Sequence, residues 1–437
     1  MEKNIFVFNK NKCVGCSACS VACMNENGFQ SPDRWRSILL SNPGQHPFLP
    51  LSYLSIACNH CDDAPCMKHC PALAYIRDEN SQAVIHLEEH CIGCKYCTWV
   101  CPYDAPKYNP DLGIVQKCTF CNHLIMKNET PACTQNCPTG ALQFEKIKPG
   151  IDENIGFPVA GIDIGAKLKI MELENLDGPE RDQTLFEENS QIPVGNRKKS
   201  SKITAEKEWM LIAFTLLAAG LVGTKSSGFI DLFGWNEKYG FLAAGLIAIL
   251  LSFMHLGNKK KAWRAILNIK KSWISREILL LGIFGVLVLT DWFIFSLPDL
   301  IFLIIGFALL YAIDMVYSKI YGNRPIMIHS SLTILIGLHL YVMLEGFTIP
   351  LIALVLIRSS IYLYQELKSI DKFTLNSFIR LLCLWGSATL IIIDFGFNYA
   401  ILFFAVGELI DRISFYDGLD VPEAKTEIQK GKQRGIK

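Results

Sequence analysis

Charged residues are scarce in this 437-residue chain, and neither sign of charge dominates. Asp, Glu, Lys and Arg make up 19% of it, against about 25% in ordinary soluble proteins. The 42 Lys and Arg residues balance 41 Asp and Glu residues, so the formal net charge is +1 and nucleic-acid binding is not indicated. With 51% hydrophobic residues and a mean hydropathy of +0.26, the chain is also too apolar to be disordered.

The sequence also lacks the common nucleotide-binding loops and an export signal. It contains no GxGxxG or GxxxxGK[ST] motif, so flavin, NAD or ATP sites of those types are not expected. The first 30 residues hold only the short apolar run 5–8 and no twin-arginine pair. We therefore expect the cysteines to be made in a reducing compartment, where metal binding is more frequent than disulfide formation.

Cysteine is almost missing from the second part of the chain and crowded into the first. Sixteen of the 17 cysteines lie between Cys13 and Cys137, and the remaining one is Cys383. The apolar excess has the opposite distribution, because it is concentrated after Trp209. The sequence therefore predicts two unlike parts, one polar and rich in cysteine and the other embedded in a membrane.

The cysteines form four groups of four with the spacing of iron–sulfur ligands. Two groups follow CxxCxxCxxxC, two have a longer middle step, and in three groups a proline follows the last cysteine. Three closely spaced thiolates can hold three corners of a cubane, and the fourth is typically a ligand of the other cluster of a pair. The spacing therefore predicts four [4Fe–4S] clusters. The groups are Cys13, Cys16, Cys19 and Cys23; Cys58, Cys61, Cys66 and Cys70; Cys91, Cys94, Cys97 and Cys101; and Cys118, Cys121, Cys133 and Cys137.

Two other uses of these cysteines agree less well with the spacing. Zinc ribbons use two CxxC pairs per metal and do not need a repeated CxxCxxCxxxC run. A disulfide framework conflicts with the expected reducing compartment. Spacing alone leaves open which groups share clusters. The runs 83–87 and 141–144 alternate like short strands, so we expect a domain of short strands and single helical turns.

The first 145 residues resemble the four-cluster iron–sulfur subunit of dimethyl sulfoxide reductase and related molybdoenzymes. The resemblance rests on the cysteine groups with their flanking residues, and on Arg34-Trp35-Arg36, Leu54 to Cys61, Cys101-Pro102-Tyr103 and Lys117-Cys118. In that family the first group pairs with the fourth and the second with the third. The resemblance implies site A, formed by Cys13, Cys16, Cys19 and Cys137; site B, by Cys118, Cys121, Cys133 and Cys23; site C, by Cys58, Cys61, Cys66 and Cys101; and site D, by Cys91, Cys94, Cys97 and Cys70.

The sequence after residue 145 predicts a linker followed by a helical membrane region. Residues 146–208 are polar, with one candidate strand at 166–171, and we expect an extension of the iron–sulfur domain followed by a linker. Most of the later apolar stretches approach the ~20 residues that a transmembrane helix needs. These stretches are 209–224, 240–257, 277–297, 300–317, 328–345, 349–367, 377–395 and 399–415.

The predicted fold class is an α+β ferredoxin-like domain with four [4Fe–4S] clusters, followed by an all-α eight-helix transmembrane bundle. The predicted boundaries are 1–145 for the iron–sulfur domain, 146–208 for its extension and linker, 209–417 for the membrane anchor and 418–437 for a polar basic tail. Asp291, Asp314, Arg358 and Asp394 fall in the apolar stretches, and we expect them to pair inside the bundle.

Positive charge is distributed unevenly between the two ends of the predicted helices. The end that carries the iron–sulfur domain has 22 Lys and Arg residues, whereas the opposite end has only Lys225 and Lys238. Because positively charged loops remain on the cytoplasmic side, we expect the iron–sulfur domain to face the cytoplasm from a bacterial inner membrane.

Residues 205–417 resemble the eight-helix quinol-oxidising anchor of dimethyl sulfoxide reductase. Residues 254–277 carry most of the resemblance, and 407–416 carry the rest. It implies that menaquinol is oxidised beside His255 and Glu277. A histidine can bond a quinol hydroxyl and a carboxylate can pass the proton on, although both residues could instead cap helices at the interface. Arg264 could bind a quinol oxygen or, equally, a lipid phosphate.

Together these features predict an electron-transfer and anchor subunit of anaerobic respiration. The chain offers no site for a terminal substrate, so the partners expected are a molybdopterin-containing catalytic subunit, the lipid bilayer and the quinone pool. Haem is not expected, because it needs opposed membrane histidines and only His255, His329 and His339 are candidates. Two alternatives stay open: quinone reduction fed by a formate- or hydrogen-oxidising partner, and a redox-driven ion-translocating module.

Overall fold

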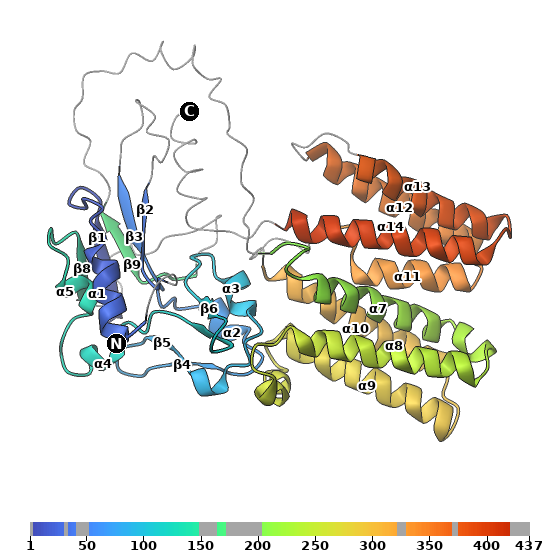
Figure 1. Ribbon diagram of the computed structural model, residues 1–437, viewed down its shortest axis with the longest axis horizontal. Helices are drawn as coiled ribbons and strands as arrows, with labels where there is room; N and C mark the ends of the chain where they lie inside the picture. Colours follow the sequence, from blue (N-terminus) through green and yellow to red (C-terminus); the bar gives the residue numbers. More distant parts are fainter. Residues whose placement is uncertain are drawn as a thin grey trace, which may run out of the picture. The chain divides into compact units, whose positions relative to one another are not determined.

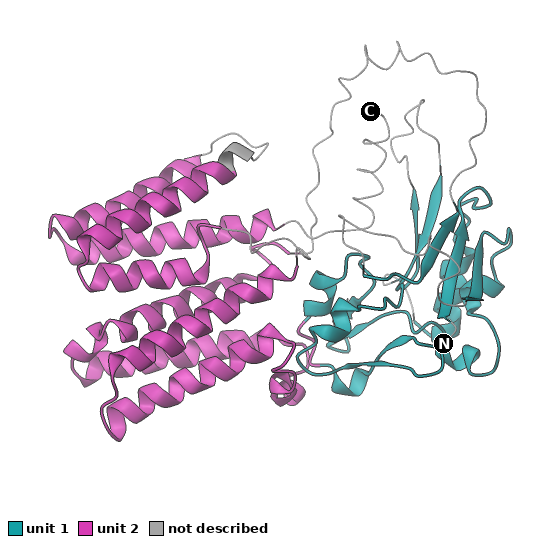
Figure 2. Cartoon of the chain, turned by 180° about the vertical axis from the view of Figure 1, so that it is seen from behind, with its two compact units in different colours: residues 1–91, 95–202, 420–437 teal, residues 92–94, 203–419 magenta. Residues whose placement is uncertain are grey.

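The computed structural model describes residues 3–29, 34–40, 52–147, 164–171, 203–320, 329–368 and 375–419. The chain divides into two compact units, which Figure 2 colours separately. Unit 1 comprises Met1–Cys91, Lys95–Lys202 and Asp420–Lys437, and unit 2 comprises Ile92–Cys94 and Ile203–Leu419. Most of the predicted linker, with its basic run 197–199, and nearly all of the predicted tail lie outside the described residues.

Unit 1 contains several short strands (Figure 1). Strand β1 (Lys3–Asn9) pairs antiparallel with β8 (Leu142–Ile147) and parallel with β9 (Leu168–Met171). The other described strands form antiparallel pairs: β2 (Ser37–Leu40) with β3 (Tyr53–Ile56), β4 (Tyr75–Arg77) with β5 (Val84–His86), and β6 (Lys107–Asn109) with β7 (Ile114–Gln116). The strands predicted near 83–87, 141–144 and 166–171 are therefore confirmed.

The helices of unit 1 are mostly single turns that carry or follow cysteines. They are α1 (Ala18–Asn27), α2 (Pro65–Lys68), η1 (Glu88–His90), α3 (Tyr96–Val100), α4 (Asn122–Ile125) and α5 (Ala132–Gln135). The loop before α1 needs Gly15, whose φ is +73° and whose added Cβ would lie 2.5 Å from Cε1 of Tyr53. Tight loops of this kind allow successive thiols to face one common core, as cubane ligands must.

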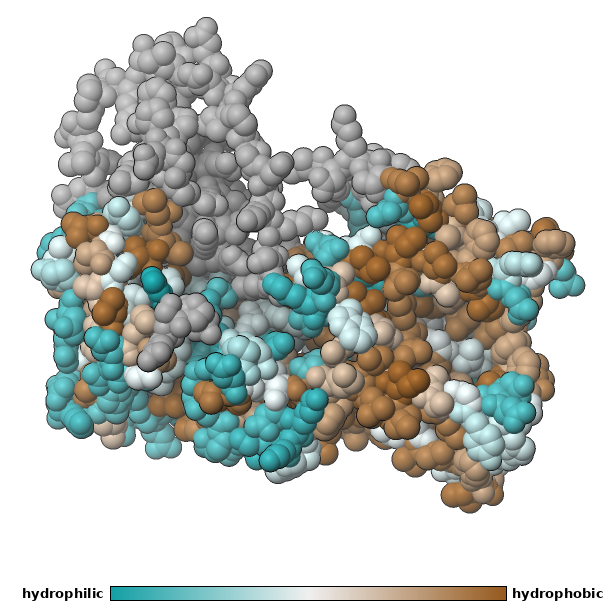
Figure 3. All heavy atoms as spheres, viewed as in Figure 1, coloured by the Kyte–Doolittle hydropathy of each residue, from teal (hydrophilic) through white to brown (hydrophobic). Residues whose placement is uncertain are grey.

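Unit 2 is helical and largely apolar on its surface. Its helices are α7 (Trp209–Ser226), α8 (Trp235–Met254), α9 (Trp273–Phe293), α10 (Asp299–Ser318), α11 (Thr333–Leu344), α12 (Thr348–Lys368), α13 (Leu375–Ile392) and α14 (Phe397–Gly418), with 3₁₀ turns η2 (Phe229–Leu232) and η3 (Lys259–Ile266). Figure 3 shows hydrophobic side chains gathered over these helices. Among the described residues, six helices are long and apolar enough to cross a membrane, namely α7, α8, α9, α10, α12 and α13. A fused membrane-capable region is thus confirmed, while eight spans remain a prediction.

Two of these helices, α8 and α9, begin about a turn earlier than the apolar stretches predict. Helix α8 begins at Trp235 rather than near residue 240, and α9 begins at Trp273 rather than near 277. The extra turn of α8 is held by ring contacts of Trp235, whose centroid lies 5.9 Å from Tyr239 and 5.5 Å from Phe293. Interfacial aromatic residues therefore lengthen a helix beyond the segment that hydropathy alone predicts.

Close helix packing in unit 2 depends on glycine. A Cβ added to Gly223 of α7 would lie 3.1 Å from the carbonyl oxygen of Gly337 in α11. A Cβ added to Gly306 of α10 would lie 2.6 Å from Cγ1 of Val222 in α7. Helix α7 consequently packs closely against both α10 and α11, as small residues permit in membrane bundles.

Candidate iron–sulfur and quinol sites

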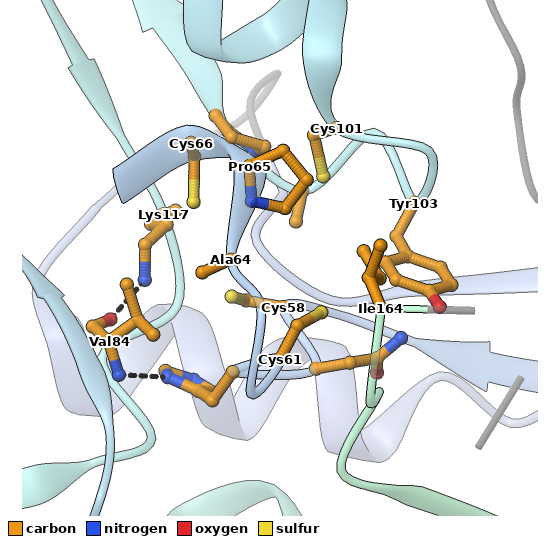
Figure 4. A pocket seen from close by; sticks show the side chains of 14 residues that line it. Cys58, Cys61, Ala64, Pro65, Cys66, Val84, Cys101, Tyr103, Lys117 and Ile164 are labelled. Carbon is orange, nitrogen blue, oxygen red and sulfur yellow. Dashed lines mark hydrogen bonds between the residues drawn. The ribbon is translucent and has the colours of Figure 1, made fainter. Parts of the chain in front are cut away.

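Four thiols line a cavity inside unit 1. Cys58 and Cys61 follow β3, Cys66 lies in α2 and Cys101 follows α3. They line this cavity together, and Figure 4 shows their sulfurs directed into it. Cluster ligands stand around a core instead of meeting at one point. These four residues make up predicted site C, and their arrangement suits cluster ligation.

The other cysteines of unit 1 gather in three further places. Cys13 lies within electrostatic range of Cys16, Cys19 and Cys137, the residues predicted for site A. Cys23 lies within range of Cys121 and Cys133, and Cys118 within range of Cys23 and Cys133, as predicted for site B. Cys70, Cys91 and Cys97 of site D pack in one cluster with Ala74 and Ile114. Cys94 is partly buried in the short segment 92–94 that groups with unit 2.

Electrostatic interactions between thiols of neighbouring groups indicate the order of the four sites. Cys133 of site B is within electrostatic range of Cys19 of site A. Cys118 of site B is within range of Cys58 of site C. Tyr75 lies beside thiols of both site C and site D, Cys66, Cys70 and Cys97. The order along unit 1 is therefore A, B, C, D.

Burial makes these thiols hard to ionise in the absence of a cation. Burial raises the pKa of Cys23 to about 12, and nearby thiols add to the effect although Arg36 opposes it. Burial likewise raises the pKa of Cys70 to about 11, although hydrogen bonds from backbone amides lower it in part. An iron–sulfur core, which needs thiolates, would supply the missing positive charge.

Several buried donors near the cysteines have no hydrogen-bond partner within the described residues. They are Arg36 Nη2, Asn59 Nδ2, His60 Nε2 and the Tyr75 hydroxyl. Asn59 and His60 line the cavity of site C. The Val84 amide donates to Nδ1 of His60 at 3.0 Å, so Nε2 carries the ring proton. Protein interiors satisfy nearly all such atoms, and the sulfides of a cluster would accept these bonds, so the residues present fit a cluster.

Two fully buried cations, which stand out in the sequence only as parts of family motifs, lie among the thiols. Burial alone would lower the pKa of Arg36, but the thiols of Cys133 and Cys118, with those of Cys19 and Cys23, outweigh burial and raise it. Burial would also lower the pKa of Lys117, and the thiols of Cys58, Cys66 and Cys118 raise it. No periodicity signals a buried cation, so only the three-dimensional arrangement reveals these two residues.

The three residues predicted for quinol chemistry lie in one connected segment of unit 2. His255 directly follows α8, and Arg264 lies in η3 with its guanidinium 5.3 Å from the ring of Trp263. Glu277 lies one turn inside α9, not at its opening, and is within electrostatic range of Asp314 and Arg412. Since η3 packs against both α8 and α9, all three residues share one end of the bundle. Their roles remain a prediction.

A buried ion network occupies the interior of the same unit. Arg358 of α12 donates to both carboxylate oxygens of Glu408, at 2.5 and 2.6 Å, and bonds Nδ1 of His339 at 2.9 Å. Arg380 is paired with Asp411, and Arg412 donates to the carbonyl of Ser331 at 2.8 Å. Charges that are scattered along the sequence are therefore contiguous in space.

The pairing predicted for intramembrane charges is confirmed for three of four residues. Arg358 is bound as above, and Oδ1 of Asp314 accepts from the amide of Thr333 at 2.9 Å. Asp291 accepts from the buried Nζ of Lys225 at 2.7 Å. The prediction is wrong for Asp394, which is exposed in the turn before α14 and has no side-chain partner among the described residues. The reason is that the turn leaves the bundle interior before this residue.

Comparison with known proteins agrees with this cysteine-rich architecture. Residues 49–147 match the family described as "4Fe-4S dicluster domain". The B subunit of anaerobic dimethyl sulfoxide reductase from Haemophilus influenzae is 35% identical over 156 residues, which cover 34% of this chain and 76% of that protein. The thiosulfate reductase electron transfer subunit of Salmonella typhi is 33% identical over 146 residues, which cover 33% of this chain and 76% of that protein. The arsenate respiratory reductase iron-sulfur subunit of Shewanella sp. is 31% identical over 183 residues, which cover 31% of this chain and 78% of that protein.

Unit 1 is thus a ferredoxin-type domain of the 4Fe-4S class. The chain belongs to the family of iron–sulfur subunits that includes the B subunit of dimethyl sulfoxide reductase. Each of these matches covers about a third of the chain, and the part of the chain that the structure describes carries six membrane-capable helices after the iron–sulfur unit.

Proposed function

We propose that this chain is the electron-transfer and membrane-anchor subunit of a quinol-dependent molybdoenzyme reductase in anaerobic respiration. Menaquinol is oxidised in the helical unit, whose eight helices span the membrane. Electrons pass singly through [4Fe–4S] clusters at sites A to D and leave for a separate, molybdopterin-containing catalytic subunit. One observation carries the proposal: thiols from distant segments surround a cavity in a chain that also carries a membrane-capable bundle.

At the quinol site the protein has to accept two protons while the electrons depart. His255 offers a ring nitrogen that can bond a quinol hydroxyl near neutral pH. Glu277 lies one turn inside the next helix, beside the polar interior formed with Asp314 and Arg412. A proton received near His255 can thus reach a carboxylate at the same end of the bundle. Arg264, in the turn between these helices, would bind a quinol oxygen or a lipid phosphate.

Cluster reduction by a menaquinol analogue tests this role. His255→Ala should slow reduction at least tenfold, because general acid–base groups contribute roughly 10²–10⁴-fold, and iron content should stay unchanged. Dithionite, which bypasses the quinol site, is the control and should reduce both proteins to the same extent. A His255→Ala protein that is reduced by the analogue at the wild-type rate would remove His255 from the mechanism.

The direction of electron flow distinguishes the proposal from its closest alternative. A quinone-reducing subunit, fed by a formate- or hydrogen-oxidising partner, would carry the same clusters and the same site. Cluster potentials depend on environment and span about −700 to +450 mV across proteins. Redox titration decides between them, since quinol oxidation requires clusters at or above the menaquinone couple.

A second candidate function is redox-driven ion translocation, which the buried ion network favours. Arg358, Glu408 and Asp411 form a contiguous set inside the bundle. Buried ionisable residues in membranes frequently mark proton relays. Proton uptake by vesicles that contain the whole complex would reveal translocation beyond the protons of quinol oxidation. A ratio of protons to electrons equal to that of quinol oxidation alone would exclude translocation.

A further inference from the structure

Two buried cations in unit 1 have no role in the function proposed so far. Arg36 and Lys117 are each only 2% exposed. Lys167, which is also buried, differs because its Nζ lies 3.9 Å from the carboxylate of Asp62. Within the described residues, neither Arg36 nor Lys117 forms such an ion pair. Isolated buried charges are costly, so these two residues need another negative partner.

Arg36 lies where sites A and B meet. Its Nη1 donates to the hydroxyl of Ser55 at 3.0 Å, and its guanidinium lies 4.5 Å from the ring centroid of Phe6. It is within electrostatic range of Cys19 of site A and of Cys133 of site B. Its Nη2 has no hydrogen-bond partner in the described part of the chain. The free donor and the charge are therefore available to the groups held by those thiols.

Lys117 lies where sites B and C meet. Its Nζ donates to the carbonyl oxygen of Val84 and, at 3.1 Å, to that of Cys118. Figure 4 shows the amine at the cavity of site C, near the thiol of Cys66. Cys58 and Cys118 are also within its electrostatic range. The amine is anchored by two carbonyls, which fixes its charge between the two sites.

We propose that Arg36 and Lys117 set the reduction potentials of the clusters beside them, a role that rests on the proposed presence of those clusters. Arg36 raises the potentials at sites A and B, and Lys117 raises those at sites B and C. The described thiols of site D face no comparable buried cation, since the buried cations of the described part of unit 1 are these two and Lys167.

The physical reason is that a cluster with four thiolate ligands is negatively charged and gains one further negative charge when it accepts an electron. A fixed cation nearby stabilises the reduced state more than the oxidised state, and weak screening inside the protein preserves the effect. Net charge and hydrogen bonds to sulfur are established determinants of cluster potential. Site B borders both cations, so its cluster receives the largest combined effect.

Redox titration of the purified full-length protein, followed by low-temperature electron paramagnetic resonance, tests the proposal. Signals are assigned to sites with one Cys→Ser variant per site. Lys117→Gln should change the reduced-to-oxidised ratio at sites B and C at least tenfold at fixed potential, which is 59 mV for a one-electron couple. Sites A and D should be unaffected. Arg36→Gln should instead lower the reduction potentials of the clusters at sites A and B. Lys117→Arg, which keeps the charge, should retain the wild-type potentials.

Lys68→Gln is the matched control. Lys68 lies two residues from each of Cys66 and Cys70, but its side chain is 45% exposed and its Nζ lies 3.2 Å from Asp63. Solvent screens an exposed charge, so the same loss of charge should change every ratio less than threefold.

Full iron content with unchanged potentials in both neutral variants would overturn the proposal, as would an equal shift at all four sites. If Arg36→Gln and Lys117→Gln lose iron, the wild-type protein tests the proposal instead. Its cluster at site B must then have a higher reduction potential than its cluster at site D, and the reverse order overturns the proposal. A wild-type protein that holds no iron would instead contradict the proposed function, so the two failures are distinguishable.

Discussion

Sixteen cysteines with similar spacing differ in their surroundings. Cys16 is exposed, whereas Cys58, Cys61 and Cys66 are buried around one cavity with Cys101. The fourth thiol of that cavity comes from a sequence group other than the first three. If each group supplies one ligand to another site, as we propose, each pair of sites would form a single folding unit, because the energy of metal binding is also energy of folding.

Cys101→Ser tests that exchange at a single residue. We expect iron to fall by one cluster, or about four atoms, with the loss at site C even though Cys101 belongs to the sequence group of site D. Iron analysis and spin quantification measure it. Cys383→Ser is the control, since Cys383 lies in α13 and belongs to none of the four cysteine groups, so its loss should leave iron unchanged. Full iron and spin in the Cys101→Ser protein would contradict the exchange.

His86 gives unit 1 a predictable sensitivity to acid. Burial, and then the charge of Lys117, lower the pKa of His86 to about 3. Histidine in an unfolded chain titrates near pH 6.5. Above that pH, keeping His86 neutral in the folded protein therefore costs no free energy of folding. As the pH falls from about 6.5 toward 3, the unfolded state binds the proton preferentially and stability is lost.

His86→Phe removes this titration. Between pH 7 and pH 5, the free energy of unfolding of the wild type should fall by about 1–2 kcal/mol more than that of the variant. The urea midpoint for loss of cluster absorbance, measured anaerobically at both pH values, gives the comparison. Identical pH dependence in the two proteins would show that His86 is not held neutral.

At the scale of elements, the contact of α7 with α11 limits side-chain size. Gly223→Val should destabilise the bundle by about 1–3 kcal/mol, because the new side chain meets the backbone of Gly337 and Cβ of Leu340. Gly220→Val on the same helix is the control, since a Cβ there meets nothing within 4 Å. Thermal unfolding in detergent should give a lower midpoint for Gly223→Val, and equal midpoints would contradict close packing.

Secondary structure and helix positions were largely predictable from the sequence, whereas long-range charge pairing was not. Alternation identified the strand that includes Val84, and hydropathy located the helices to within about a turn. The pair Arg358–Glu408 joins residues 50 positions apart, and no local pattern encodes such a distance. Arg36 and Lys117 were missed for the same reason, since only folding shows that they are buried.

At the scale of the whole molecule, the charge distribution predicts orientation. If the eight proposed spans all cross the membrane, the 22 basic residues fall at one end, and we expect the iron–sulfur unit and the C-terminus to face the cytoplasm. Alkaline phosphatase fused after residue 437 should be inactive, and the same reporter inserted at 346–348 should be active. Activity at the C-terminal fusion would contradict this topology.

The most direct measurement is the metal content of the anaerobically purified full-length chain. We expect about sixteen iron atoms per chain, with paramagnetic signals at low temperature after reduction. A protein that binds zinc instead, with no such signals on reduction, would contradict the central claim that its thiols hold an electron-conducting chain of clusters.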